Sequence, residues 1–126
     1  MDLPQTDNYR RLFLDDVPLV DVRAPAEYQQ GAFPLARNLP LVNDEEREAI
    51  GIRYKEQGQE KAIELGYDLV KGDLKEQRVT NWTAFTREHP QGALYCFRGG
   101  MRSKISQQWI YDKTGVMYPR VIGGYK

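Results

Sequence analysis

Short apolar runs, too brief to be helices, alternate along this chain with longer segments of helical pattern. The runs 19–22 (LVDV) and 93–95 (ALY) are typical of strands buried in a sheet. Helical patterns cover 43–70, with a break at Gly58, and 74–88. Because strands that alternate with helices pair in parallel, the sequence predicts an α/β domain with a central, mainly parallel sheet and helices on both faces.

Shorter elements complete this pattern. A helical turn is expected at 24–28, ending at Gly31, and a strand at 36–40. A further helix is expected over 102–113 and a last strand over 117–122. The helical positions expected to face the core are Ala62, Ile63, Leu65, Leu74, Val79, Trp82, Phe85, Ile105, Trp109 and Ile110.

Length, charge and hydropathy limit the classes of function. The 126 residues suffice for one core, and 18 basic against 18 acidic residues give no overall charge that favours nucleic acid or membranes. The charges are uneven, however, because residues 91–126 hold six basic residues and one acidic residue, which suits an anionic partner. No apolar run is long enough to cross a bilayer and the first residues lack a secretory pattern, so we expect a cytoplasmic protein.

Cys96 is the only cysteine and His89 the only histidine. One cysteine excludes an internal disulfide, and the two counts together exclude a cysteine-rich or histidine-based metal site. His89 falls in the turn that ends the 74–88 helix, so we expect it to be an exposed loop residue and not a catalytic base.

The most informative segment joins the 93–95 strand to the helix that follows. A nucleophilic thiol must be ionised, and a free cysteine is mostly protonated at neutral pH. Inward-facing loop amides, the amino end of the helix and two arginines would favour the anion and bind an oxyanion beside it, while the glycines permit the tight curl. The alternative is a buried cysteine acting only as a small apolar side chain. The candidate site residues are Cys96, Phe97, Arg98, Gly99, Gly100, Met101, Arg102 and Ser103.

Three motifs, in the right order, resemble those of rhodanese-like domains. The first is Leu19-Val20-Asp21-Val22-Arg23 followed by Glu27-Tyr28, Gly31, Pro34, Ala36, Asn38 and Pro40; the others are the Cys96 loop and Val121-Ile122-Gly123-Gly124-Tyr125. The loop 95–103, the pattern Gly51-Ile52, Tyr54-Lys55, Gly58 and the ending 123–126 are similar to the rhodanese-like domain of bacterial tRNA 2-selenouridine synthases.

This resemblance implies a rhodanese-like fold and sulfur or selenium transfer through Cys96, with residues 97–103 holding the anionic substrate. It implies a domain with no cofactor of its own, taken from a longer enzyme that continues into a P-loop domain, since this chain contains no P-loop motif. For the full enzyme it implies the wobble 2-thiouridine of tRNA, selenophosphate and geranyl diphosphate as substrates. Selenophosphate synthetase is implied as a partner.

The sequence also departs from the rhodanese pattern. Gly31-Ala32-Phe33-Pro34 stands where Gly-His-Ile-Pro is common. No role of that histidine can therefore be carried over to this chain. Five residues separate Cys96 from Arg102, one more than in simple thiosulfate sulfurtransferases. The wider loop would suit a tetrahedral, phosphate-like anion such as selenophosphate and argues against thiosulfate turnover.

Two other functions remain open on these residues. The five-residue spacing is also that of dual-specificity phosphatases and arsenate reductases, although Tyr95 precedes Cys96 where phosphatases have histidine, and no second cysteine is present. The second alternative is a non-catalytic module that docks tRNA or a protein through the basic 91–126 segment. A retained thiol argues against it.

Two residues at the end of the first expected strand are candidates for a supporting role. Asp21 and Arg23 lie at a strand end from which they could reach the site. We expect them instead to form a structural ion pair that fixes the turn together with Glu27. The acidic run 44–46 is expected to be a solvated helix start.

Overall fold

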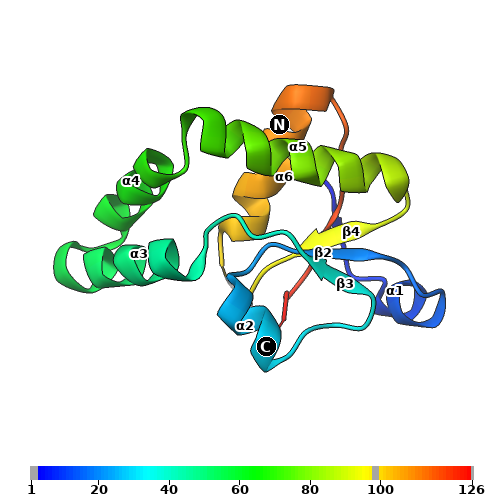
Figure 1. Cartoon of the computed structure of the whole chain (residues 1–126). Helices are drawn as coiled ribbons and strands as arrows, with labels where there is room; N and C mark the ends of the chain where they lie inside the picture. The colour runs from blue at the N-terminus through cyan, green and yellow to red at the C-terminus, as the bar shows by residue number, and fades with distance from the viewer. Residues whose placement is uncertain (1–2, 98–99, 126) are drawn as a thin grey trace.

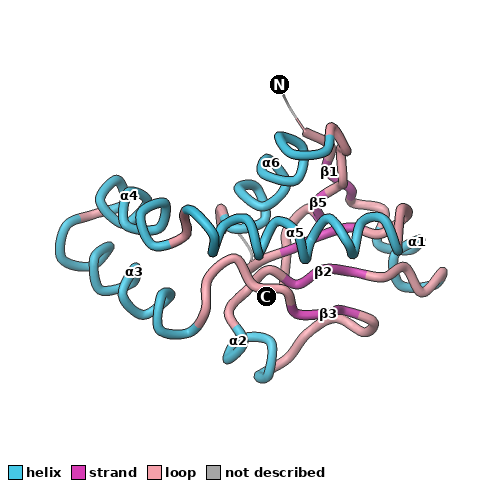
Figure 2. The backbone as a smooth tube through the Cα atoms, turned by 45° about the horizontal axis from the view of Figure 1, so that its top comes forward, coloured by secondary structure: helices cyan, strands magenta, loops and turns pink. Residues whose placement is uncertain are grey.

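Five short parallel strands form the centre of the molecule (Figures 1 and 2). The computed structural model describes residues 3–97 and 100–125. The strands are β1 Gln5–Thr6, β2 Leu19–Asp21, β3 Ala36–Asn38, β4 Ala93–Tyr95 and β5 Arg120–Val121. Their order is β1-β5-β4-β2-β3, and every neighbouring pair is parallel. The predicted α/β class and parallel sheet are confirmed.

Six helices surround the sheet within the described residues. They are α1 Tyr9–Leu14, α2 Pro25–Gln30, α3 Asp44–Gln57, α4 Gln59–Leu69, α5 Gly72–Glu88 and α6 Arg102–Thr114. Alternate strand residues point to opposite faces. Val20 and Leu94 pack against α5 and α6, whereas Leu19 and Tyr95 lie in a second cluster with Leu12 of α1. Helices therefore cover both faces of the sheet, as predicted.

Helices α3 and α4 form a hairpin that projects to one side of the sheet (Figure 1). Asn43 caps α3 by accepting a hydrogen bond from the amide of Glu46, and Gly58, with a φ of 89°, breaks the helical path between α3 and α4. No described residue of α3 is buried. Of the predicted core positions in α4, Ala62 is buried, but Ile63 and Leu65 are only half-buried, because the hairpin stands away from the sheet.

The two ends of the chain differ most from expectation. Residues 1–18, which carry no strand pattern, supply β1 and α1. The last strand was expected over 117–122 but covers only Arg120–Val121, and Met117 is exposed. Strand β1 is only two residues long and forms by pairing with β5, which is equally short. No local sequence pattern therefore indicates where either strand begins or ends.

In α5 and α6 most predicted core positions are buried, namely Val79, Trp82, Phe85, Trp109 and Ile110. Leu74 and Ile105 are only half-buried. The Trp82 indole donates to the carbonyl of Leu39 at 2.7 Å, which satisfies its only donor. Among the described residues no helix combines the length and the apolar character needed to cross a membrane.

A buried ion pair holds the end of β2. The carboxylate of Asp21, 0% exposed, lies 2.7 Å from the guanidinium of Arg23, 2% exposed. Arg23 also donates to the carbonyl of Gly31 at 2.7 Å, and the Tyr95 hydroxyl donates to Asp21 at 2.8 Å. The predicted structural pair between Asp21 and Arg23 is confirmed.

Replacing Arg23→Met tests the weight of this pair. The change leaves the buried carboxylate of Asp21 without its counter-charge, which costs roughly 3–5 kcal/mol in comparable sites. Urea unfolding followed by tryptophan fluorescence measures the loss. The control is Arg37→Met, since Arg37 lies 3.8 Å from Glu88 with both side chains more than half exposed, and should change stability by less than about 1 kcal/mol. Equal effects from the two variants would contradict the assignment.

Candidate active site

Cys96 lies where β4 ends, at the carboxyl edge of the parallel sheet, which is where open α/β folds carry their sites. The residue is 3% exposed. Its Sγ lies 3.2 Å from Oγ of Ser103, a buried residue in the first turn of α6. The thiol donates to this hydroxyl, and in the thiolate form the hydroxyl can donate to the sulfur. The predicted contact between Cys96 and Ser103 is confirmed.

The main chain around Cys96 is held from two sides. Its carbonyl accepts the amide of Tyr125 at 2.9 Å, and Phe97 forms a parallel bridge with Tyr125. The amide of Gly100 donates to the carbonyl of Phe97 at 2.9 Å. A Cβ on Gly100 would lie 3.3 Å from Sγ of Cys96 and 3.1 Å from the Phe97 carbonyl oxygen, so a side chain there would crowd the thiol.

The other predicted loop residues differ in position. The Phe97 side chain is 45% exposed and Met101, directly before α6, is 40% exposed. Arg98 and Gly99 lie outside the described residues. Among the described residues, no three His, Cys, Asp or Glu side chains are grouped to hold a metal ion.

Arg102, expected to face an oxyanion, is paired with a carboxylate. Its guanidinium donates through both terminal nitrogens to the two oxygens of Glu27, the Nη2–Oε2 distance being 3.0 Å. Arg47 of α3 lies 3.3 Å from the same carboxylate. Glu27 thus faces α6 and α3 and does not belong to the Asp21–Arg23 ion pair. Its turn-fixing role is confirmed, since Oε1 accepts the amide of Ala24 at 3.0 Å.

The charge on Glu27 is stabilised by its partners. Burial raises the pKa of this carboxyl, but the hydrogen bond and charge of Arg102, with help from Ala24 and Arg47, outweigh burial and lower the pKa below its ordinary value of 4.5. Glu27 is thus ionised at neutral pH, and Arg102 and Arg47 together leave one positive charge in excess at this point.

Asp21 and Arg23 lie behind the loop. The Arg23 guanidinium is 4.3 Å from the ring centre of Tyr125, whose amide holds the carbonyl of Cys96. Burial and the charge of Asp21 raise the pKa of Tyr95, so its hydroxyl remains a donor to that carboxylate. The pair therefore holds the two tyrosines that flank the loop.

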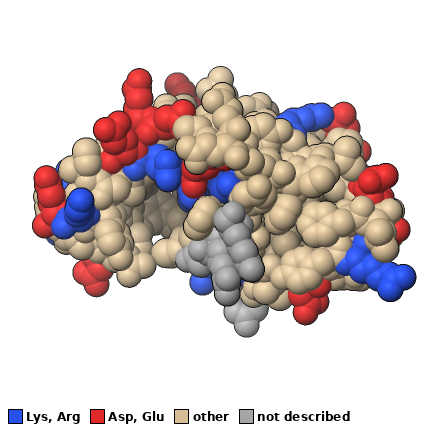
Figure 3. Space-filling model, turned by 90° about the horizontal axis from the view of Figure 1, so that it is seen from below, with Lys and Arg blue, Asp and Glu red and all other residues tan. Residues whose placement is uncertain are grey.

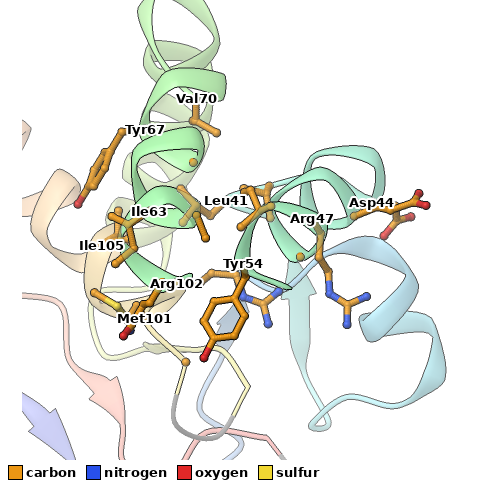
Figure 4. A pocket seen from close by; sticks show the side chains of 18 of the residues that line it. Leu41, Asp44, Arg47, Tyr54, Ile63, Tyr67, Val70, Met101, Arg102 and Ile105 are labelled. Atoms are coloured by element: carbon orange, nitrogen blue, oxygen red, sulfur yellow. The ribbon is translucent and has the colours of Figure 1, made fainter. Parts of the chain in front are cut away.

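A cavity of about 870 Å³ opens beside the loop, between the α3–α4 hairpin and α6 (Figure 4). We call it the hairpin chamber. Figure 3 shows the hollow between the hairpin and the rest of the molecule, with acidic and basic side chains together at its edge. Its lining includes Leu41, Ile50, Ile63, Tyr67, Met101 and Arg102.

Sequence reasoning missed the chamber, Arg47 and the partner of Arg102. The Glu27-Tyr28 motif marked Glu27 as notable, but not its partner. For Arg47 the sequence offers no signal.

Replacing Glu27→Gln should weaken the attachment of α6. Because the folded-state pKa of Glu27 is lowered, its contribution to stability is present above pH 4.5 and is lost as the pH falls further. At pH 7 we expect a loss of about 1–3 kcal/mol in unfolding free energy, shrinking toward zero in acid. Urea unfolding at several pH values measures this. Glu88→Gln, at an exposed carboxylate, is the control, and a Glu27→Gln deficit independent of pH would refute the assignment.

Comparison with known proteins shows which proteins this chain resembles in sequence and in fold. No protein-family profile matches the chain. It is 61% identical over 123 residues to a tRNA 2-selenouridine synthase of Marinobacter nauticus, covering 98% of this chain and 33% of the relative. The corresponding protein of Bordetella petrii is 59% identical, covering 96% of this chain and 32% of the relative. The chain thus spans about a third of the length of these curated relatives.

Two solved structures share the fold. The N-terminal domain of a Clostridium difficile 630 protein named for ATP or GTP binding superposes with a TM-score of 0.76 at 31% identity, covering 96% of this chain and 92% of that one. The human single-domain sulfurtransferase TSTD1 superposes with a TM-score of 0.50 at 18% identity, covering 99% and 93%. The chain has a rhodanese-like fold and is homologous to the N-terminal part of tRNA 2-selenouridine synthases.

Proposed function

We propose that this chain is the sulfur- or selenium-transferring domain of a tRNA 2-selenouridine synthase and that Cys96 is its nucleophile. The observation that carries the proposal is the placement of Cys96 Sγ at the end of β4, 3.2 Å from Ser103 Oγ and beside the amino end of α6. A helix amino end and a hydroxyl donor both stabilise a neighbouring anion. The identity of 61% to a curated synthase gives the chemistry its context.

The proposed step is attack of the Cys96 thiolate on the outer sulfur or selenium atom of a donor whose leaving group is an oxyanion. With selenosulfate as a chemical test donor, distinct from the selenophosphate proposed for the longer protein, the Se–S bond of the donor breaks and a bond forms between Sγ and selenium. Sulfite departs with the electron pair, and Cys96 carries a terminal selenide anion. Atoms and charge balance without a cofactor, and the chain's single cysteine means that the acceptor comes from outside this domain.

Among the described residues, Arg102 is the basic residue closest in sequence to Cys96. We expect it to contact the leaving oxyanion. Its pairing with Glu27 fixes the guanidinium at the start of α6. A bound oxyanion would therefore either displace the Glu27 carboxylate from this guanidinium or share the guanidinium with it. Arg98, Gly99 and the remaining loop amides stay predicted contributors. Asp21 and Arg23 support the loop through Tyr95 and Tyr125.

For the longer protein we propose the wobble 2-thiouridine of tRNA as the acceptor, with selenophosphate and geranyl diphosphate as further substrates and selenophosphate synthetase as the supplier of selenium. The work would take place in the cytoplasm. A P-loop domain is proposed for the part of the relatives that this chain does not span.

Treatment of the chain with selenosulfate, followed by intact-mass spectrometry, tests the nucleophile. We expect a gain of one selenium atom per chain, released by a thiol reductant and absent from Cys96→Ser. A Cys96→Ser chain that gains the same mass would overturn the assignment of the thiol. Steady hydrolysis of p-nitrophenyl phosphate, lost in Cys96→Ser, would favour the phosphatase alternative. Full tRNA modification in cells by a Cys96→Ala protein would favour the docking alternative.

Arg102→Gln tests the oxyanion contact separately. Loss of one preorganised donor to a developing oxyanion slows reactions by about a hundredfold or more. We expect that loss in the rate of adduct formation, measured by stopping the selenosulfate reaction at intervals. Arg47→Gln, which removes the second cation near Glu27, is the matched comparison and should slow the reaction less. Equal rates for Arg102→Gln and the unaltered chain would contradict a role for Arg102.

A further inference from the structure

We propose that Arg47 is a positioning residue for the transfer at Cys96: it takes over the carboxylate of Glu27 when a bound oxyanion draws Arg102 toward the loop. This inference rests on the proposed function for the anion that Arg102 meets. It gives the α3–α4 hairpin a part in the reaction, because Arg47 lies in α3.

Arg102 serves two anions with one guanidinium. Both of its terminal nitrogens donate to the oxygens of Glu27, with Nη2 and Oε2 3.0 Å apart. Arg102 also directly precedes Ser103, whose Oγ lies 3.2 Å from Sγ of Cys96, so the side chain starts beside the proposed oxyanion. Two anions on one guanidinium repel each other. An oxyanion that binds Arg102 therefore draws it at least partly away from Glu27.

Glu27 cannot lose this partner without compensation. Its side chain is only 10% exposed, and a buried charge that loses its partner is strongly destabilised. The amide of Ala24 donates to Oε1 at 3.0 Å, but a neutral donor does not replace a positive charge. Without a second cation, the cost of uncovering Glu27 would oppose the binding of every anion at Arg102.

Arg47 is a second cation at this carboxylate. Its Nε lies 3.3 Å from Oε1 of Glu27, and its side chain is 52% exposed, so packing does not hold it away from a closer contact. Figure 4 shows the guanidinium groups of Arg47 and Arg102 on the same side of the hairpin. One arginine suffices to neutralise Glu27, which leaves Arg102 available to the oxyanion.

The first turn of α3 holds Arg47 in this position. The side chain of Asp44 accepts the amide of Ala26 at 2.9 Å, which ties this turn to α2. Residues three apart on a helix lie on the same side, so Arg47 faces α2 as Asp44 does. Arg78 donates to Glu46 at 2.8 Å and ties the same turn to α5. The backbone beneath Arg47 is thus anchored, while its side chain reaches Glu27 from the solvent side.

Sulfate binding by the Cys96→Ser chain, measured by calorimetry, tests the exchange without a contribution from the thiol. In this parent chain, Arg47→Gln should weaken sulfate binding about tenfold at neutral pH, the loss expected for one partly exposed charge-assisted contact. Arg47→Lys keeps the charge and should bind nearly as well as the parent. Lys55→Gln, which removes an exposed charge from the same helix, is the matched control and should leave the affinity unchanged.

A second change, Glu27→Gln, distinguishes positioning from direct contact. If Arg47 acts by holding Glu27, removal of this carboxylate frees Arg102, and Glu27→Gln/Arg47→Gln should bind sulfate as well as Glu27→Gln alone. An Arg47 that contacts the anion itself, or that only supports the fold, would cost the same affinity in both backgrounds. That result would overturn the proposal.

The deficit of Arg47→Gln should also depend on pH. Burial raises the pKa of Glu27, whereas Arg102, with help from Arg47, lowers it below its ordinary value in the unaltered chain. With Arg47 replaced and Arg102 drawn to sulfate, burial dominates and the carboxyl takes up a proton more readily. Sulfate affinity relative to the parent should therefore recover as the pH falls from neutral to about 5. A deficit that stays constant over this range would contradict the exchange.

The other charges near Glu27 do not produce this recovery. Arg102 and Arg47 contact the carboxylate and Arg23 acts on it from the end of β2, and arginines stay charged throughout this range. The carboxylate of Asp44 is turned to the amide of Ala26 and is present in the parent and in every variant. Comparison at each pH with the parent therefore reports on Glu27.

These measurements separate this inference from the proposed function. Sulfate binding does not require a reactive thiol, so a chain that forms no selenium adduct can still show the rescue by Glu27→Gln. An adduct that forms while the rescue fails would overturn the role of Arg47 alone. If the double variant does not fold, the pH dependence of Arg47→Gln and the comparison with Arg47→Lys decide. A parent chain that binds no sulfate would overturn the proposal.

Discussion

The carboxylate of Glu27 joins three helices at one point. It receives two hydrogen bonds from Arg102 at the start of α6, lies 3.3 Å from Arg47 of α3, and fixes the start of α2 through the amide of Ala24. The Cys96 loop is bounded by β4 on one side and by α6 on the other, so the position of α6 decides where Ser103 meets the sulfur. The same carboxylate holds the base of the hairpin, and so sets one wall of the chamber.

The site therefore combines a rigid base with an open side. β4, Tyr95 and Tyr125 are locked by the buried pair of Asp21 and Arg23. The hairpin contributes few buried residues and leaves a large apolar space beside the loop. For the proposed transfer, this division keeps the Cys96 thiol in a fixed position while the side of the site next to the hairpin stays open.

Local sequence patterns predicted what depends on near neighbours. Cys96 and Ser103 meet because only residues 96–101 separate the end of β4 from the start of α6, and the break at Gly58 follows from its own backbone conformation. The pairing of Arg102 with Glu27 joins residues 75 positions apart, and no periodicity reports such a contact. Strand β1 likewise depends on a distant partner, β5. The amphipathic pattern of α4 predicts that Ile63 is buried in the core. In the structure Ile63 lines the chamber instead and is only half-buried.

Because the chain has a single cysteine, Cys96 can be labelled selectively. Any thiol-directed reagent can modify only one atom of this chain, and that atom lies beneath Gly100 with 3% of its residue surface accessible. The speed at which alkylating agents of graded bulk reach it gauges the aperture of the loop, and a fluorophore or spin label fixed there would sense the adjoining space from within. A label on this residue would thus report on the space between the loop and the hairpin.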